Sequence, residues 1–279
     1  MKLYTYEADG KTLFGAEKDG GLVDLTGVAP DLLSLIRGGE AKLEEARGVL
    51  RDSAPRHRLS EVRIRVPMRP GKILCSGVNY TAHALENPNA KMPTEPFFFA
   101  KLPSSVIGPG EAIRKGVTEQ LDYEVEFSVV IGKPLAVGTA GEAVMDAIFG
   151  YTLLNDVSAR DVQFKDNQIT LGKNLETFAP IAPGIVTKDE IPAPNNVALR
   201  TTLNGKVLQD GSTSDWLFKL PVLVGHVLKY MPLEPGDIVT TGTPAGVGLF
   251  QQPQVFMKPG DVVIIEAEGI GRLENPVVA

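Results

Sequence analysis

The chain has 279 residues, of which 43% are hydrophobic, so it can bury a substantial core and form one large domain with a small one. Its 34 acidic and 28 basic side chains leave a formal net charge of −6 with no long block of either sign. This argues against nucleic-acid binding, because proteins that hold phosphate backbones usually carry a basic face. Cys75 is the only cysteine, which excludes an intrachain disulfide and a cysteine-based zinc site.

The sequence also argues against export and against insertion into a membrane. Residues 1–9 lack the basic start and the apolar run of a signal peptide. No stretch approaches the ~20 consecutive apolar residues that a transmembrane helix needs. We therefore expect no membrane partner and a cytoplasmic location.

Residues 1–68 predict a small α+β domain. Residues 2–6 and 21–25 are strand-like. Asp31 is placed to cap a helix over the apolar residues that follow it, and a second helical pattern covers residues 43–50. Prolines at positions 67 and 70 then bracket the entry into a larger domain, which we assign to residues 69–279.

The larger domain is predicted to consist mostly of strands separated by turns rich in Gly and Pro. Asn204 and Gly205 lie between two strand-like runs and tolerate positive φ, so they predict a β-hairpin. One amphipathic helix is expected at residues 217–231. The expected strands cover residues 72–75, 97–101, 125–131, 151–154, 181–186, 197–203, 206–208, 237–241, 262–268 and 272–276.

The most informative stretch is residues 121–131 (LDYEVEFSVVI). A strand here puts Glu124 and Glu126 on one face, about 7 Å apart, and apolar side chains on the other face. Two carboxylates entering a core repel each other and lose hydration, and a divalent cation would compensate them. From this stretch alone, a half-exposed strand with a hydrated acidic face has equal weight. Asp156, at the end of a second apolar run, shifts the balance toward a metal, and three oxygen ligands suit Mg²⁺ or Mn²⁺ better than zinc.

Seven segments, taken in order, resemble the fumarylacetoacetate hydrolase superfamily, whose members include acylpyruvate hydrolases, oxaloacetate decarboxylases and hydroxymuconate-type isomerases. The resemblance runs from residue 71 to the carboxyl end. It implies an α+β, mostly β fold with a mixed β-roll catalytic domain that forms a homodimer, and it makes Glu124, Glu126 and Asp156 the metal ligands. The segments are 77–86 (GVNYTAHALE), 99–101 (FAK), 122–126 (DYEVE), 155–161 (NDVSARD), 172–178 (GKNLETF), 204–205 (NG) and 241–248 (TGTPAGVG).

The candidate catalytic pair is His83 and Glu86. One helical turn would bring these residues together, so that the carboxylate orients and charge-stabilises the imidazole. An accidental surface pair is the alternative from the sequence alone. The resemblance implies instead that this pair activates a water and belongs to a lid, and the loop-like residues 87–93 fit such a lid.

The resemblance assigns roles to four further residues. Lys173 would meet the developing negative oxygen of the substrate, although a lone lysine is usually a solvated surface charge. Arg160 and Gln163 would contact the substrate carboxylate or oxo group, whereas the simpler interpretation pairs Arg160 with a neighbouring acid at position 161 or 166. Thr243 lies in a Gly-rich turn whose amides could hold the substrate carboxylate. This turn is not a nucleotide-binding motif.

Together these residues predict a Mg²⁺-dependent enzyme, with Mn²⁺ as the other suitable ion, acting on a small 2-oxo acid that chelates the metal. It would cleave a C–C bond through a metal-bound enolate, as an acylpyruvate hydrolase or an oxaloacetate decarboxylase. The residues do not separate these two reactions. A lyase or isomerase acting on hydroxymuconate-like diacids or ureidoglycolate is one alternative. A metal- and 2-oxo-acid-binding protein without catalysis is the other.

Overall fold

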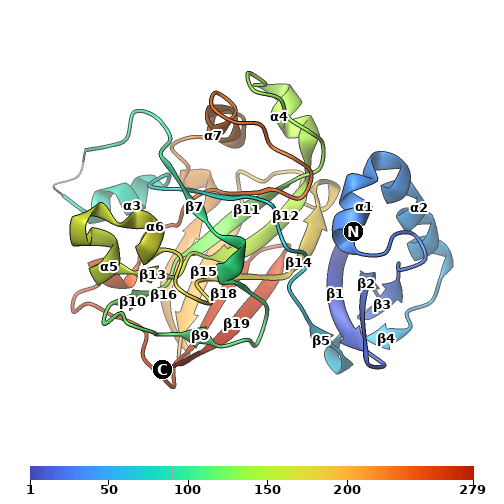
Figure 1. Ribbon diagram of the computed structural model, residues 1–279, viewed down its shortest axis with the longest axis horizontal. Helices are drawn as coiled ribbons and strands as arrows, with labels where there is room; N and C mark the ends of the chain where they lie inside the picture. The colour runs from blue at the N-terminus through green and yellow to red at the C-terminus, as the bar shows by residue number, and fades with distance from the viewer. Residues whose placement is uncertain (89–90) are drawn as a thin grey trace.

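The structure is a computed structural model that describes residues 1–88 and 91–279 (Figure 1). It contains both helices and strands, with strands dominant, arranged in a 12-stranded sheet, a 5-stranded sheet and a 2-stranded ribbon. The predicted fold class, α+β and mostly β, is therefore confirmed. None of the helices within the described ranges is long and apolar enough to cross a lipid bilayer.

The amino-terminal part carries its own small set of elements. Asp31 caps α1 as expected, since its side chain accepts from the backbone N–H of Ser34 at 2.7 Å. The sequence did not predict strand β2, because Gly15 interrupts its apolar pattern. Glycine is required there, since a Cβ at Gly15 would lie 2.3 Å from the carbonyl oxygen of Val23 on the paired strand. The elements are β1 (Lys2–Ala8), β2 (Lys11–Lys18), β3 (Gly21–Asp24), α1 (Leu32–Arg37), α2 (Gly39–Asp52), β4 (His57–Arg58) and β5 (Arg63–Ile64).

Strand β1 joins this amino-terminal part to the main sheet, because it pairs antiparallel with β14. The strand order from one edge to the other is β4-β3-β2-β1-β14-β12-β11-β17-β6-β7. A domain boundary between residues 68 and 69 stays a prediction. The strands contributed by the larger part are β6 (Ile73–Ser76), β7 (Phe98–Lys101), β8 (Val106–Ile107), β11 (Val125–Ile131), β12 (Ile148–Asn155), β14 (Ala179–Thr187) and β17 (Ile238–Thr240).

The 5-stranded sheet packs against the centre of the main sheet. One buried cluster contains Phe127 and Leu153 from the main sheet together with Ile265 and Leu273 from the smaller one. The predicted hairpin is present in this smaller sheet, where Asn204 and Gly205 have φ of 50° and 82°. Its strands are β9 (Ile113–Arg114), β15 (Ala198–Leu203), β16 (Lys206–Ser212), β18 (Val262–Ala267) and β19 (Gly271–Val278).

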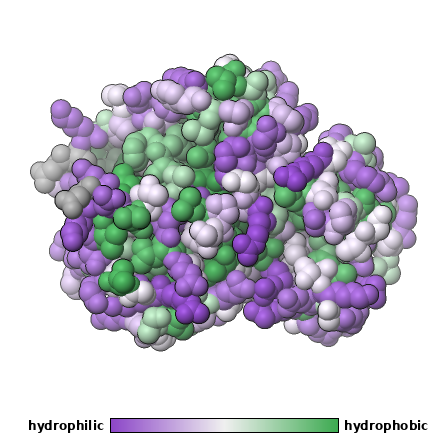
Figure 2. Space-filling model, in the orientation of Figure 1, coloured by the Kyte–Doolittle hydropathy of each residue, from purple (hydrophilic) through white to green (hydrophobic). Residues whose placement is uncertain are grey.

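Three short helices, α3 (Thr81–Glu86), α5 (Arg160–Phe164) and α6 (Ile169–Gly172), gather at one end of the molecule beside the ribbon of β10 (Leu121–Asp122) and β13 (Ser158–Ala159) (Figure 1). In Figure 2 apolar side chains collect over α5 and α6, where Phe164 and Leu171 are exposed. This end of the molecule carries the candidate site.

Helix α7 (Leu220–Val227) packs with α4 (Glu142–Ala147) and is shorter than predicted. Asn79 accounts for the later start, because its backbone carbonyl accepts from the N–H of Leu217 and its side chain accepts from the N–H of Phe218, both at 2.8 Å. These tertiary hydrogen bonds hold residues 217–218 outside the helix.

Candidate active site

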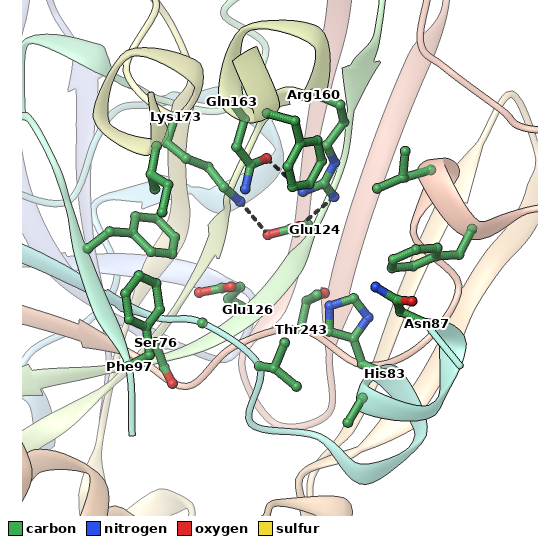
Figure 3. A pocket seen from close by; sticks show the side chains of 18 of the residues that line it. Ser76, His83, Asn87, Phe97, Glu124, Glu126, Arg160, Gln163, Lys173 and Thr243 are labelled. Atoms are coloured by element: carbon green, nitrogen blue, oxygen red, sulfur yellow. Dashed lines mark hydrogen bonds and ion pairs between the residues drawn. The ribbon is translucent and has the colours of Figure 1, made fainter. Parts of the chain in front are cut away.

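A pocket of about 270 Å³ opens beside α3, α5 and α6 (Figure 3). Its polar lining comes from segments far apart in the sequence, namely the end of β6, α3 and the residues that follow it, the start of β11, α5, the end of α6 and the turn after β17. The rest of the lining is largely apolar and includes Phe97, Phe99, Phe164, Ile169, Leu249 and Phe250. Charged groups are therefore concentrated on one side of a pocket whose other walls are apolar.

Buried acids and buried cations meet at the base of this pocket. Arg160 Nη2 lies 2.5 Å from Glu124 Oε1 and 2.8 Å from Asp122 Oδ2. Lys173 Nζ lies 2.8 Å from Glu124 Oε2 and 2.7 Å from Asp156 Oδ2. No side chain in these pairs is more than 7% exposed. Each cation thus holds two carboxylates in a low-dielectric setting, where a missing partner would be costly.

Lys101 completes the network beneath the pocket. Its Nζ lies 2.5 Å from Asp156 Oδ1, and it also donates to the backbone carbonyls of Val157 at 3.1 Å and Lys173 at 2.6 Å. Three acceptors therefore use all three ammonium hydrogens. The contact at Asp156 leaves only Oδ2 of that carboxylate toward Lys173 and the pocket.

Glu126 is the acid of this group that has no cation partner among the described residues. Its side chain is buried, and no described residue donates a hydrogen bond to Oε2. Burial, followed by the charges of Asp156 and Glu124, raises the pKa of Glu126 well above its ordinary value. At Glu124, burial acts in the same direction, but the charges of Arg160 and Lys173 outweigh it and hold the pKa below its ordinary value. The network therefore carries one uncompensated carboxylate.

His83 and Glu86 lie face to face on α3, with 2.6 Å between Nδ1 and Oε2. The other carboxylate oxygen of Glu86 accepts from the backbone N–H of Gly246 at 2.7 Å. Because a carboxylate can only accept, Nδ1 carries a hydrogen, and Nε2 is the basic nitrogen whenever the ring is neutral. His83 lines the pocket across from the carboxylates (Figure 3).

Arg160 does not form the surface pair that was the simpler interpretation. Its guanidinium is buried and also donates to Gln163 Oε1 at 3.2 Å. The carboxylate of Asp161 instead accepts from the hydroxyl of Thr118 and the backbone N–H of Glu119. The side chain of Asp166 lies outside the described part of the chain.

Seven of the nine predicted site residues line the pocket: His83, Glu124, Glu126, Arg160, Gln163, Lys173 and Thr243. The other two lie directly behind the lining, where Glu86 pairs with His83 and Asp156 pairs with Lys173. Of the expected lid at residues 87–93, positions 89 and 90 lie outside the described residues. The roles of all nine stay predictions, but the fold brings them together at one place.

Residues 72–278 match the family model described as fumarylacetoacetate hydrolase, C-terminal. The chain belongs to the fumarylacetoacetate hydrolase family. This match covers the whole of the pocket and every predicted site residue, so the resemblance seen in the sequence is confirmed.

Relatives of this family member share most of its length. It is 40% identical to the mitochondrial oxaloacetate tautomerase of Xenopus laevis over 270 residues, which is 94% of this chain and 84% of that one. A fumarylacetoacetate hydrolase structure from Exiguobacterium antarcticum matches with a TM-score of 0.85 at 35% identity, covering 100% of this chain and 99% of the other. The structure of maleylpyruvate hydrolase from Sphingobium sp. SYK-6 with manganese(II) and pyruvate matches with a TM-score of 0.83 at 26% identity, again covering 100% and 99%.

Three residues of this family member's site escaped the sequence interpretation, namely Asp122, Lys101 and Gln209. Asp122 lies inside the informative acidic stretch, and Lys101 ends one of the seven matching segments. The position of each residue in the sequence was therefore a sign that it belongs to the site. Gln209 had none, because nothing in a strand of alternating residues marks one glutamine as buried. All three are buried and hydrogen-bonded to predicted site residues or their neighbours.

Proposed function

We propose that the chain is a Mg²⁺- or Mn²⁺-dependent enzyme that acts on a small 2-oxo acid. The observation that carries this proposal is Glu126, a buried carboxylate without a cation partner among the described residues, in the lining of a pocket that also includes Glu124 and His83. Asp156 and Glu86 lie directly behind that lining, where Asp156 is paired with Lys173 and Glu86 forms a dyad with His83. A buried, uncompensated charge is costly, and a divalent cation would compensate it.

The donor set fits such an ion. Glu124, Glu126 and Asp156 would hold it through carboxylate oxygens, the ligand type that Mg²⁺ and Mn²⁺ prefer. Lys173 contacts two of these carboxylates with its ammonium group, which indicates that the same oxygens attract positive charge. When bound, the ion would act as a Lewis acid toward the carboxylate and the 2-oxo oxygen of a substrate.

The protein's own side chains would do the remaining work. His83, held by Glu86, would use Nε2 to take a proton from water or from the carbon next to the oxo group. Lys173 would stabilise negative charge that develops on a substrate oxygen. Arg160 and Thr243 would orient the substrate carboxylate. The aromatic walls would exclude water from the reacting atoms.

Two reactions fit this arrangement. The first is C–C cleavage, in which water activated by the dyad attacks the distal carbonyl of an acylpyruvate, or in which oxaloacetate loses carbon dioxide. The second is keto–enol tautomerisation of oxaloacetate, which needs only proton transfer at the carbon between the two carbonyl groups. It is favoured by the relatives at about 40% identity, which are named oxaloacetate tautomerases. Both reactions pass through an enolate, so the same residues would serve either one.

The test is a substrate panel assayed with Mg²⁺, with Mn²⁺ and with a chelator. Acylpyruvates, oxaloacetate and a hydroxymuconate-like diacid are followed by product analysis, and the oxaloacetate enol is followed by its ultraviolet absorbance. Wild type is expected to turn over at least one 2-oxo acid only when metal is present, and Glu126→Ala and His83→Ala are expected to lose that turnover. Unchanged rates in Glu126→Ala would overturn the metal assignment. Binding of metal and pyruvate without any turnover would favour the non-catalytic alternative.

Two further expectations accompany this proposal. The homodimer stays a prediction, as does the cytoplasmic location. Relatives from Xenopus laevis and Homo sapiens are named as mitochondrial proteins.

A further inference from the structure

Gln209 is a buried glutamine on β16 whose amide orientation is fixed by its neighbours. The backbone N–H of Val125, which can only donate, meets Oε1 at 3.1 Å. The backbone carbonyl of Pro244, which can only accept, meets Nε2 at 2.8 Å. The hydroxyl of Thr201 adds a second donor to Oε1 at 2.7 Å. Reversing the amide would break the contacts to both backbone groups, so its oxygen and nitrogen can be assigned from chemistry alone.

This orientation decides what the Thr243 hydroxyl can do. The second hydrogen of the Gln209 amide points at Thr243 Oγ1, at 2.8 Å. The hydroxyl oxygen therefore accepts a hydrogen bond, and its own hydrogen must be directed elsewhere. Among residues 1–88 and 91–279 the structure shows no hydrogen bond that the Thr243 hydroxyl donates, and Thr243 is 3% exposed. The open side is the pocket, where Figure 3 shows Thr243 near Glu126 and His83.

We propose that Gln209 is a positioning residue that makes the Thr243 hydroxyl a fixed hydrogen-bond donor toward the pocket, where it binds a carboxylate or oxo oxygen of the substrate. This inference rests on the proposed function. It adds a residue outside the pocket lining whose side chain is hydrogen-bonded to Thr243. A hydroxyl that could rotate would serve as donor or acceptor, whereas this one is restricted to the role that an anionic ligand requires.

The same amide also aligns two parts of the site. Val125 lies between the two glutamates of the acidic strand, and Pro244 follows Thr243 in the turn after β17. By bonding to both backbones, Gln209 holds the turn at a fixed distance from the carboxylates. A glutamate at this position would keep the acceptor for Val125 and Thr201, but it would present an oxygen to the carbonyl of Pro244 and an acceptor to Thr243.

The test is a double-mutant cycle of Gln209→Glu and Thr243→Val, with KM and kcat measured for the best substrate of the panel. In Gln209→Glu the Thr243 hydroxyl donates to the new carboxylate instead of to the substrate. Because hydrogen bonds to charged groups are the stronger ones, we expect KM to rise about tenfold. We expect kcat to change by less than about threefold, because the lost hydrogen bond contributes to substrate binding and not specifically to the transition state. Thr243→Val is expected to give a similar rise.

The decisive measurement is whether the change in KM caused by Gln209→Glu depends on the residue at position 243. If Gln209 only stabilised the fold, the change would not depend on that residue. In the Thr243→Val background, Gln209→Glu is expected to raise KM by much less than it does in wild type, since the hydroxyl is already absent. Equal rises in both backgrounds would overturn the proposal. Thr201→Val is the matched control, because it removes a donor from the same amide oxygen without touching Thr243, and its KM is expected to stay that of wild type.

Two further variants keep the test decisive if Gln209→Glu does not fold. Gln209→Met is uncharged and of similar size, and its effect on KM must also depend on Thr243. Thr243→Ser keeps the hydroxyl and is expected to retain the wild-type KM, so a Ser variant that behaves like the Val variant overturns the proposal. The panel with wild type tests the proposed function separately. If wild type shows no turnover, the same cycle is read from the Kd of pyruvate in the presence of Mn²⁺.

Discussion

Lys101 and Asp156 form an ion pair in which neither side chain is exposed, with 2.5 Å between Nζ and Oδ1. The lysine comes from β7 and the aspartate follows β12, so this contact joins two separated strands beneath the pocket. Because Lys101 also saturates two backbone carbonyls, it acts as a fixed buried cation rather than as a group available to a substrate.

Replacing this lysine is therefore expected to destabilise the fold strongly. Lys101→Met leaves Asp156 Oδ1 buried without its partner, and breaking such a pair costs about 3–5 kcal/mol. The free energy of unfolding from urea titration measures this loss. Lys42→Met is the control, since Lys42 makes a 2.7 Å pair with Glu45 in which the two side chains are 43% and 49% exposed, and it should cost about 1 kcal/mol or less. Equal losses in the two variants would contradict the structural role given to Lys101.

Glu126 is expected to behave in the opposite way. Glu126→Gln introduces a side chain that cannot ionise at a place where burial and two neighbouring carboxylates oppose ionisation, so the metal-free variant should melt at the same temperature as wild type or higher. The variant should also lose the rise in Tm that Mg²⁺ or Mn²⁺ produces in wild type. Thermal unfolding with added metal and with chelator measures both effects. A variant that melts lower without metal and still responds to metal would contradict the assignment.

The dyad should matter for turnover and not for metal binding. His83→Gln is expected to lower kcat by about 10²–10⁴-fold, the usual contribution of a positioned acid–base group. The metal-induced shift in Tm should stay that of wild type, because His83 is not among the proposed ligands. His226→Gln is the control, since His226 stacks on Phe98 and contacts the ring of Tyr230 at a tilt, outside the pocket. A similar fall in kcat for both variants would argue against a specific role for His83.

Asp161 predicts a component of acid sensitivity. Burial raises the pKa of Asp161, but hydrogen bonds from the hydroxyl of Thr118 and the backbone N–H groups of Glu119 and Val162 outweigh it and lower the pKa below its ordinary value. A carboxyl with a lowered folded-state pKa contributes stability that is present above the unfolded pKa of about 3.9 and is lost as pH falls through the folded pKa. Below about pH 4, wild type should therefore lose stability more steeply than Asp161→Asn. Denaturant titrations from pH 7 to pH 3 compare the two slopes, and parallel curves would contradict the assignment.

Cys75 should be inert in the folded protein. It lies fully buried on β6, and burial raises its pKa. Since the thiolate is the reactive form, a thiol reagent such as DTNB should not modify the native protein at pH 8 and should modify one thiol per chain after unfolding in guanidinium. Rapid modification of the native protein would show that β6 opens easily.

Local patterns were enough to recognise several elements and part of the site. The cap at Asp31 and the turn at Asn204–Gly205 depend on a few neighbouring residues, and both are present. The alternation after Glu124 is also local, and it places Val125, Phe127, Val129 and Ile131 in one apolar cluster as expected. The His83–Glu86 contact follows from one turn of helix.

The family, the mostly-β class and the residue types that meet in the pocket could all be read from the amino-acid pattern. The tertiary structure decided which of those residues are compensated and by what. Lys101 meets Asp156 across 55 positions, and Gln209 meets Thr243 across 34. Lysine and glutamine are usually solvated, so only the folding together of distant strands makes them part of a buried network and leaves Glu126 without a cation among the described residues.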